Sequence, residues 1–115
     1  MSTTREAGDR GEAMAAEYLR ENGYELLASQ FRCRFGEIDL IARRGDILCF
    51  VEVKLRKNDR FGAASDAVTA VKQEKLRKAA ASWLASHECE APARFDVIEV
   101  YTETGRINHI ENAFE

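Results

Sequence analysis

Three charged residues, Asp39, Glu52 and Lys54, interrupt two apolar segments of the chain. Two neighbouring carboxylates can bind a hard divalent cation, and an ammonium group beside them can contact a phosphate. A cation held in this way can activate a water molecule and contact a phosphodiester. If the fold brings the three side chains together, the pattern indicates a metal-dependent nuclease.

The two apolar segments, residues 36–44 and 47–54, are predicted to form a β-hairpin around Gly45 and Asp46. A two-residue turn that begins with glycine is typical of type II′, and it would pair residues whose numbers sum to 91. Asp39 would then lie opposite Glu52. A turn longer by one residue would move one strand's charges to the other face.

Alternation along the strands assigns the side chains to two faces. We expect one face to carry Glu37, Asp39, Ile41, Phe50, Glu52 and Lys54. We expect the other face to carry Ile38, Leu40, Ala42, Cys49, Val51 and Val53. Apolar residues on both faces indicate a hairpin that is covered on both sides, where charges need partners. The alternative is that the three charges lie on a solvated face.

Length and composition predict a single domain over residues 1–115 of a globular protein. The chain is 45% apolar and 32% charged, and it contains no apolar run of the roughly 20 residues that cross a bilayer. The N-terminus has no apolar signal-peptide core, so we expect a cytoplasmic protein without a membrane partner. Three cysteines at wide spacing form no zinc pattern, and His87 and His109 are assigned no role.

The net charge of −3 conceals an uneven distribution of charge. Residues 31–78 contain 12 Lys and Arg against 7 Asp and Glu, whereas the segments on either side are acidic. Phosphate binding depends on local potential, so a basic face remains available to nucleic acid.

The remaining elements are read from periodicity and caps. Thr4 or Asp9 can begin a first helix that ends at Asn22, before Gly23. Residues 24–31 read as a strand, 32–35 as a turn, and 55–64 as a polar, cationic loop.

A second helix is predicted from Ser65 or Asp66 to Ser86. Its buried stripe is predicted to be Val68, Val71, Leu76, Ala79, Ala80, Trp83 and Leu84. Residues 95–101 read as a buried strand, and 106–110 as a terminal edge strand. The order α-β-β-β-α-β, with a further β at the end, predicts an α/β sandwich with a mixed sheet.

Asp39 followed by Glu52-Val53-Lys54 resembles the Asp…(Asp/Glu)-x-Lys motif of the restriction-endonuclease-like nucleases. Further motifs are similar to the YraN family, small bacterial proteins related in fold to archaeal Holliday-junction resolvases. These motifs are Gly-Glu at 11–12, Gly-Glu-Ile-Asp-Leu-Ile-Ala at 36–42, Phe-Val-Glu-Val-Lys at 50–54, Ala-Val at 67–68, Lys-Gln at 72–73 and Arg-Phe-Asp-Val at 94–97. The resemblance covers residues 10–112 and implies a restriction-endonuclease-like sandwich with a mixed central sheet.

Carried over by position, the resemblance implies that Asp39 and Glu52 bind Mg²⁺ or Mn²⁺, with the carbonyl of Val53 as a third ligand. Lys54 would be the catalytic lysine. Glu12 would complete the site from the first helix, and Gln73 would support it from the second.

DNA, branched or single-stranded, is the expected substrate, and a homodimer would suit cutting of two strands. Backbone contacts are expected from Arg32, Arg34, Arg43, Arg44, Arg56, Lys57, Arg60 and Lys72. No module for base readout is present, so recognition of nucleic-acid shape is expected. Two alternatives remain: a nucleic-acid-binding module with little turnover, and an interaction domain that recruits a basic partner through acidic residues 79–115.

Overall fold

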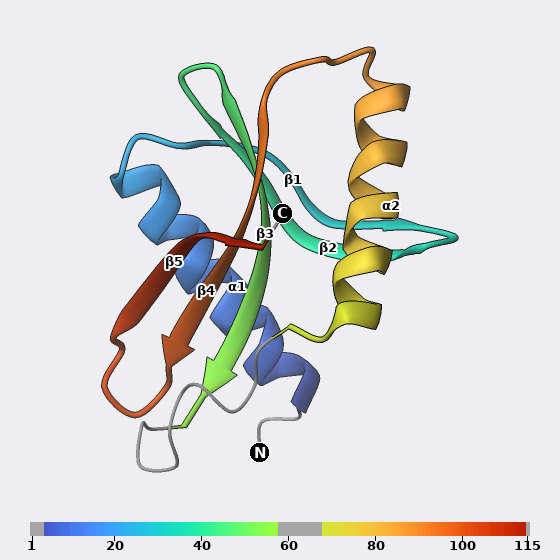
Figure 1. The fold of residues 1–115 in the computed structure, drawn as a ribbon. Helices are drawn as coiled ribbons and strands as arrows, with labels where there is room; N and C mark the ends of the chain where they lie inside the picture. Colours follow the sequence, from blue (N-terminus) through green and yellow to red (C-terminus); the bar gives the residue numbers. More distant parts are fainter. Residues whose placement is uncertain (1–3, 58–67, 115) are drawn as a thin grey trace.

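The computed structural model describes residues 4–57 and 68–114, which form one five-stranded sheet between two helices (Figure 1). Along the chain the elements are α1 (Thr4–Glu21), β1 (Glu25–Cys33), β2 (Gly36–Arg44), β3 (Ile47–Arg56), α2 (Ala70–Ser86), β4 (Ala93–Tyr101) and β5 (Ile107–Phe114). The predicted α/β class and element order are confirmed, including the terminal strand. Within the described ranges, no helix is long and apolar enough to span a membrane.

The strands lie side by side in chain order, from β1 to β5. Only the β3–β4 pair is parallel, because α2 carries the chain back across the sheet between these two strands. The other three pairs are antiparallel, so the predicted mixed sheet is confirmed.

The predicted hairpin register is confirmed over the part of the ladder next to the turn. Leu40 lies opposite Val51, and Arg44 lies opposite Ile47. Gly45 has a φ of +61°, which the first position of a type II′ turn requires.

Beyond Leu40 and Val51 the two strands separate. Strand β3 stays paired with β4 from Leu48 to Arg56, while β2 stays paired with β1, including the pair of Glu37 with Arg32. Asp39 and Glu52 are therefore not a ladder pair, and the extrapolated pairing of Glu37 with Lys54 is wrong. Ile38 packs in the cluster beside α2, not with Leu40 as alternation predicted, because β2 leaves the regular ladder before this position.

Two apolar cores explain why both faces of the hairpin are apolar. On the α1 side, Leu40 and Val51 pack against Ala15 and Leu19. On the α2 side, the core contains Ile41, Leu48, Phe50, Leu76, Ala79, Ala80 and Trp83. The prediction of a sheet covered on both faces is confirmed.

The first helix ends as its sequence predicts. Gly23 has a φ of +84°, and the N–H groups of Gly23 and Tyr24 donate to the carbonyls of Arg20 and Leu19 at 3.2 and 2.9 Å. These two bonds form a Schellman motif, which satisfies the last helical carbonyls.

The start of the second helix was predicted too early. Ser65 and Asp66 lie outside the described residues, and α2 begins at Ala70 with Thr69 as its N-cap. The hydroxyl of Thr69 accepts the N–H of Lys72 at 3.2 Å. Val71 is 68% exposed, so its assignment to the buried stripe is wrong; it belongs to the first turn, before the helix reaches the core.

Two other boundaries differ from prediction. Strand β3 continues through Leu55 and Arg56, because these residues pair with Val100 and Tyr101 of β4. The turn between β1 and β2 contains only Arg34 and Phe35, since Cys33 and Gly36 are already paired. Parallel pairing and a tight hairpin thus extend strands into segments whose composition is polar.

A buried ion cluster joins β4, β5 and α1. The side chain of Asp96 accepts two hydrogen bonds from Arg94 at 2.8 and 2.9 Å, one from His109 at 2.7 Å and one from the Asn112 N–H at 3.0 Å. The hydroxyl of Tyr18 on α1 contacts the other ring nitrogen of His109 at 3.1 Å. Burial opposes ionisation of Asp96, but these partners outweigh it and lower its pKa. His109, which the sequence left without a role, therefore has a structural one.

We expect Asp96→Ala to lower the free energy of unfolding by about 3–5 kcal/mol, because it leaves the guanidinium of Arg94 without its main partner. Urea unfolding followed by circular dichroism measures this loss. Asp46→Ala, at the exposed β2–β3 turn, is the matched control and should change stability by less than about 0.5 kcal/mol. Equal effects of the two substitutions would contradict a stabilising role for the cluster.

Gly11 lets α1 approach the end of β3. A Cβ atom placed on Gly11 would lie 2.3 Å from Cδ2 of Leu55, so any larger residue must displace that side chain. The close approach carries the next residue of the helix, Glu12, toward the point where β2 and β3 separate.

Gly11→Ala tests this contact. Alanine favours a helix over glycine by about 1 kcal/mol, but overpacking typically costs about 1–3 kcal/mol. We therefore expect a net loss of stability in the wild-type background. In a Leu55→Ala background the clash is absent, and Gly11→Ala should stabilise the protein. A double-mutant cycle by urea unfolding measures both effects, and the same sign in both backgrounds would refute the close contact.

Candidate active site

The separation of β2 from β3 opens a pocket of about 330 Å³. Its lining comes from α1, β2 and β3 and consists of Glu12, Asp39, Glu52, Val53, Lys54 and Leu55. Four of the five side chains predicted as catalytic therefore line one pocket.

Asp39 is held where the two strands part. Its Oδ2 atom accepts a hydrogen bond from the Val53 N–H at 2.8 Å. This bond takes the place of the β2–β3 ladder bonds, which end at the pair of Leu40 with Val51. Burial, together with the negative charge of Glu52, raises the pKa of Asp39 to about 7. The hydrogen bond from Val53 offsets only part of this effect. Asp39 thus lies beside other carboxylates, and the positive charges around it do not balance theirs.

Glu52 is buried, with 7% of its surface exposed, whereas Asp39 is half-buried. Its Oε1 atom forms an ion pair with the Nζ atom of Lys72, which extends from the first turn of α2. The Thr69 cap fixes that turn and so positions Lys72. The sequence suggested Lys72 as a contact for DNA, but here it is the cation beside a candidate metal ligand.

Glu12 reaches the pocket from α1. Its Oε2 atom accepts a hydrogen bond from the amide of Gln30 at 3.2 Å. The Oε1 atom is buried and has no hydrogen-bond partner among the described residues. Burial raises the pKa of Glu12, and the nearby carboxylates of Glu37 and Asp9 raise it further. The helix therefore brings a third carboxyl group to the cluster, as the resemblance implied.

Gln73 takes a different position from Lys72. Its amide donates to the Val68 carbonyl at 2.8 Å, and its oxygen accepts a hydrogen bond from Arg77 at 3.1 Å. These contacts hold the start of α2, and Gln73 is not among the residues that line the carboxylate pocket.

The donor set is suited to a hard divalent cation. Mg²⁺ usually takes one or two protein carboxylates and completes its shell with water. Asp39 and Glu52 match that number, and Val53, whose carbonyl is the third ligand that the resemblance implied, lines the same pocket. Within the described ranges, no three His, Cys, Asp or Glu side chains are grouped closely enough to hold a metal by themselves. A site with few protein ligands and several waters is the one that fits.

The basic residues predicted to contact DNA are dispersed over the structure. Several already have partners: Arg32 pairs with Glu37 at 3.6 Å, Arg43 with Glu25 at 2.9 Å, Arg34 lies over the ring of Phe35, and Arg44 lies over the ring of Tyr24. Arg56 forms a largely buried ion pair with Glu99 at 3.1 Å, a structural arrangement that leaves little of it for a ligand. Lys57 is exposed just beyond the pocket, and Arg60 lies outside the described residues.

Several of these basic residues are also far from the carboxylate pocket along the chain. Arg43 and Arg44 follow Asp39 by four and five residues, a separation of roughly 13–17 Å at about 3.3 Å per residue. Arg32 lies near the end of β1 and Arg34 lies in the β1–β2 turn, toward the other end of β2 from Arg43 and Arg44. Lys75 of α2 lies near this hairpin, because its Cβ is 3.7 Å from a Cβ built on Gly36. Lys54 lines the carboxylate pocket and Lys72 contacts Glu52. Strand periodicity could not predict the contact of Lys72, which comes from a helix.

The raised pKa of Asp39 predicts a pH-dependent stability. The folded state holds a proton on Asp39 up to about pH 7, whereas the unfolded chain releases it near pH 4, so ionisation opposes folding between these values. From pH 5.5 to pH 8, wild type should lose about 2 kcal/mol relative to Asp39→Asn. The asparagine side chain of this variant can still accept the hydrogen bond from Val53, so the variant should fold.

Urea unfolding at the two pH values, in EDTA, measures this difference. Asp46→Asn is the matched control, since Asp46 is exposed in the turn of the same hairpin. Parallel pH profiles for wild type and Asp39→Asn would refute the raised pKa, and an unfolded Asp39→Asn would refute a merely repulsive role for this carboxylate.

Comparison with known proteins places the chain. The model of the Uncharacterised protein family UPF0102 matches residues 11–100. A UPF0102 protein of Nitrosomonas europaea, NE0719, is 43% identical over all of this chain and 98% of its own length. A UPF0102 protein of Geobacter metallireducens is 47% identical over 94% of this chain and 91% of its own length. The resemblance to the YraN family, which is this family under another name, is confirmed: the chain belongs to the uncharacterised family UPF0102.

Proposed function

We propose that the protein is a metal-dependent nuclease that hydrolyses phosphodiester bonds in branched, flap or single-stranded DNA. The observation that carries the proposal is the gathering of Glu12, Asp39 and Glu52 in one pocket at the strand split, where partial burial and the charge of Glu52 raise the pKa of Asp39 to about 7. Carboxylates whose mutual repulsion raises a pKa in this way, and so destabilises the folded protein when they ionise, are typical of a functional site. A divalent cation would supply the missing positive charge.

The proposed cation would bind Asp39 and Glu52, lower the pKa of a bound water and contact the scissile phosphate. Asp39 is oriented for this role by the N–H of Val53, which occupies its Oδ2 atom and leaves Oδ1 for another partner. Lys54 lines the same pocket and would orient the water or stabilise charge on the phosphate. A role in charge stabilisation suits Lys54, because an ammonium group in this pocket can contact the negative charge of a phosphate.

Lys72 would act with Lys54 at the phosphate. It now neutralises part of the charge on Glu52, and binding of a divalent cation at Glu52 would weaken that attraction. The ammonium group would then be available to a phosphate oxygen close to the site. Lys57, exposed beyond the end of β3, could extend the backbone contacts.

A nucleic-acid-binding module with little turnover is the second candidate. It is favoured by the ion pair of Lys72 with Glu52, because an internal cation already satisfies one of the two proposed metal ligands. In this case metal would contribute little to the binding of DNA.

A cleavage assay distinguishes the two candidates. Labelled junction, flap, duplex and single-stranded DNA should be incubated with Mg²⁺, Mn²⁺ or EDTA and with wild type or Asp39→Asn. We expect cleavage that requires metal and falls by at least about 100-fold in Asp39→Asn, because that variant weakens both metal binding and positioning. Asp46→Asn should cleave as wild type does.

Each contrary result has a definite meaning. Equal cleavage by wild type and Asp39→Asn would show that this carboxylate does not support the reaction. Salt-sensitive binding by both proteins without cleavage in any metal would favour the binding module. Absence of binding at low salt would exclude both candidates.

A further inference from the structure

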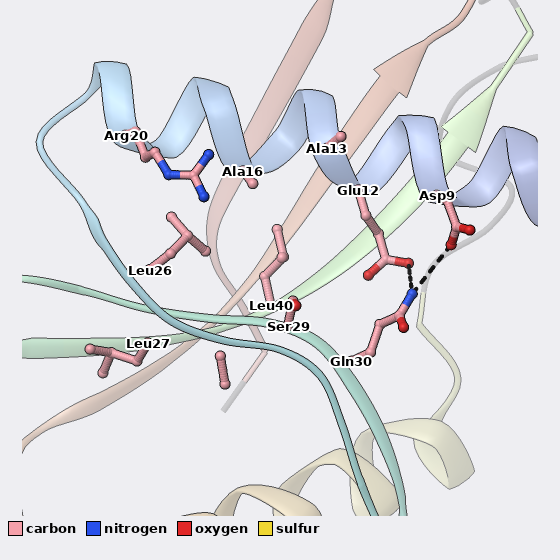
Figure 2. Close-up of a pocket in the computed structure, with 11 residues that line it drawn as sticks. Asp9, Glu12, Ala13, Ala16, Arg20, Leu26, Leu27, Ser29, Gln30 and Leu40 are labelled. Carbon is pink, nitrogen blue, oxygen red and sulfur yellow. Dashed lines mark hydrogen bonds between the residues drawn. The ribbon is translucent and has the colours of Figure 1, made fainter.

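A second groove lies beside the carboxylate pocket, between α1 and β1 (Figure 2). It has a volume of about 500 Å³, and Glu12 lines both this groove and the carboxylate pocket. A ligand that extends from one hollow could therefore enter the other past this side chain.

The groove has two polar ends and an apolar middle. Ala16 of α1 faces Leu26 and Leu40 across its centre, and Ala13 also lines the groove. At one end the amide of Gln30 bridges Asp9 and Glu12, at 3.3 and 3.2 Å. Figure 2 shows Arg20 two turns away along α1, at the other end. This arrangement suits a flat, largely apolar ligand with polar edges.

The shape of β1 supports the groove. The register of β1 against β2 shifts between Leu26 and Ala28, which places a bulge at Leu27 on the wall of the groove. Gln30 adopts a φ of +52°, a conformation that residues other than glycine rarely take. Its side chain thereby reaches across to α1 (Figure 2). Bulges and such conformations are often found beside functional sites.

We infer that the groove binds an unpaired nucleobase, that of the nucleotide next to the scissile phosphodiester, with its amino edge at Glu12 and Asp9. This inference rests on the proposed function, because it takes DNA as the ligand of the neighbouring pocket.

The hydrogen-bonding groups of the groove favour this ligand. The Oε1 atom of Glu12 is buried without a partner among the described residues. A rotation of the carboxyl group toward the groove would bring this atom to a ligand that donates a hydrogen bond, which would satisfy it. Cytosine and adenine present an exocyclic amino group, which donates to such an oxygen. Thymine presents two carbonyl oxygens beside its single N–H, and these would face the carboxylates unfavourably.

The same chemistry defines the class of substrate. A base in a duplex is stacked and uses its amino edge for pairing, so it cannot enter a groove without leaving the helix. An unpaired base at a branch, bulge or flap avoids most of that cost. The groove would thus make the proposed nuclease select DNA with an unpaired nucleotide at the cleavage position.

Binding measurements with bulged DNA test the inference. The probe is a labelled duplex with one unpaired nucleotide, which is deoxycytidine, deoxyadenosine, thymidine or an abasic analogue. Fluorescence anisotropy with the Asp39→Asn protein in EDTA measures affinity without cleavage. We expect the deoxycytidine probe to bind at least about fivefold more tightly than the abasic probe, from contacts to one base.

Filling the groove should abolish this difference. Ala13 is exposed and lines the groove, so in Ala13→Leu the added side chain would occupy the space proposed for the base while leaving the carboxylates in place. Ala85→Leu is the matched control, an exposed alanine of α2 outside the groove, and it should keep the full difference. Equal affinity for the deoxycytidine and abasic probes, or an undiminished difference in Ala13→Leu, would overturn the inference.

A second measurement needs no groove variant. Deoxycytidine monophosphate should shift the methyl NMR signals of Leu26 and Leu40 in wild type, and absence of any shift there would count against the base site. The test also separates the two proposals. Base discrimination without metal-dependent cleavage would support the base site and refute the nuclease. Metal-dependent cleavage that does not vary with the unpaired base would support the nuclease and refute the base site.

Discussion

The candidate site depends on one constraint, which is that β3 cannot pair with β2 along its whole length. After Val51 it continues in the sheet beside β4, while β2 turns toward β1, and the ladder between them ends. The Val53 N–H, which would otherwise lack a partner on that side, donates to Asp39. A backbone group thus orients a carboxylate at the point where the sheet opens.

Two aspartates of the same sheet, the half-buried Asp39 and the buried Asp96, show how the surroundings decide the chemistry. Asp96 has Arg94, His109 and a backbone N–H as partners, and its pKa is lowered. Asp39 has one backbone N–H and several carboxylate neighbours, and its pKa is raised to about 7. The first arrangement contributes to stability, whereas the second reduces it once Asp39 ionises, as expected of the proposed cation site. This contrast, more than the presence of acidic residues, distinguishes the candidate active site from the structural ion cluster.

Local sequence patterns predicted much of the fold correctly. The glycine-first turn set the register near Gly45, the apolar residues on both hairpin faces predicted two covering layers, and Gly23 marked the end of α1. Extrapolation failed where β2 and β3 separate. Ile38 and Glu37 were assigned by continuing a ladder that ends at Leu40 and Val51, beyond which β2 remains paired only with β1.

The sequence by itself determined which residues could do chemistry, because Asp39, Glu52 and Lys54 are polar groups placed within apolar strands that must be buried. It could not determine their partners. Only the tertiary structure brought Lys72 rather than Gln73 to Glu52, placed Arg56 in an ion pair with Glu99, and opened a groove between Glu12 and β1. The physical reason is that strand and helix periods are local, whereas electrostatic partners and cavities depend on how separate elements pack.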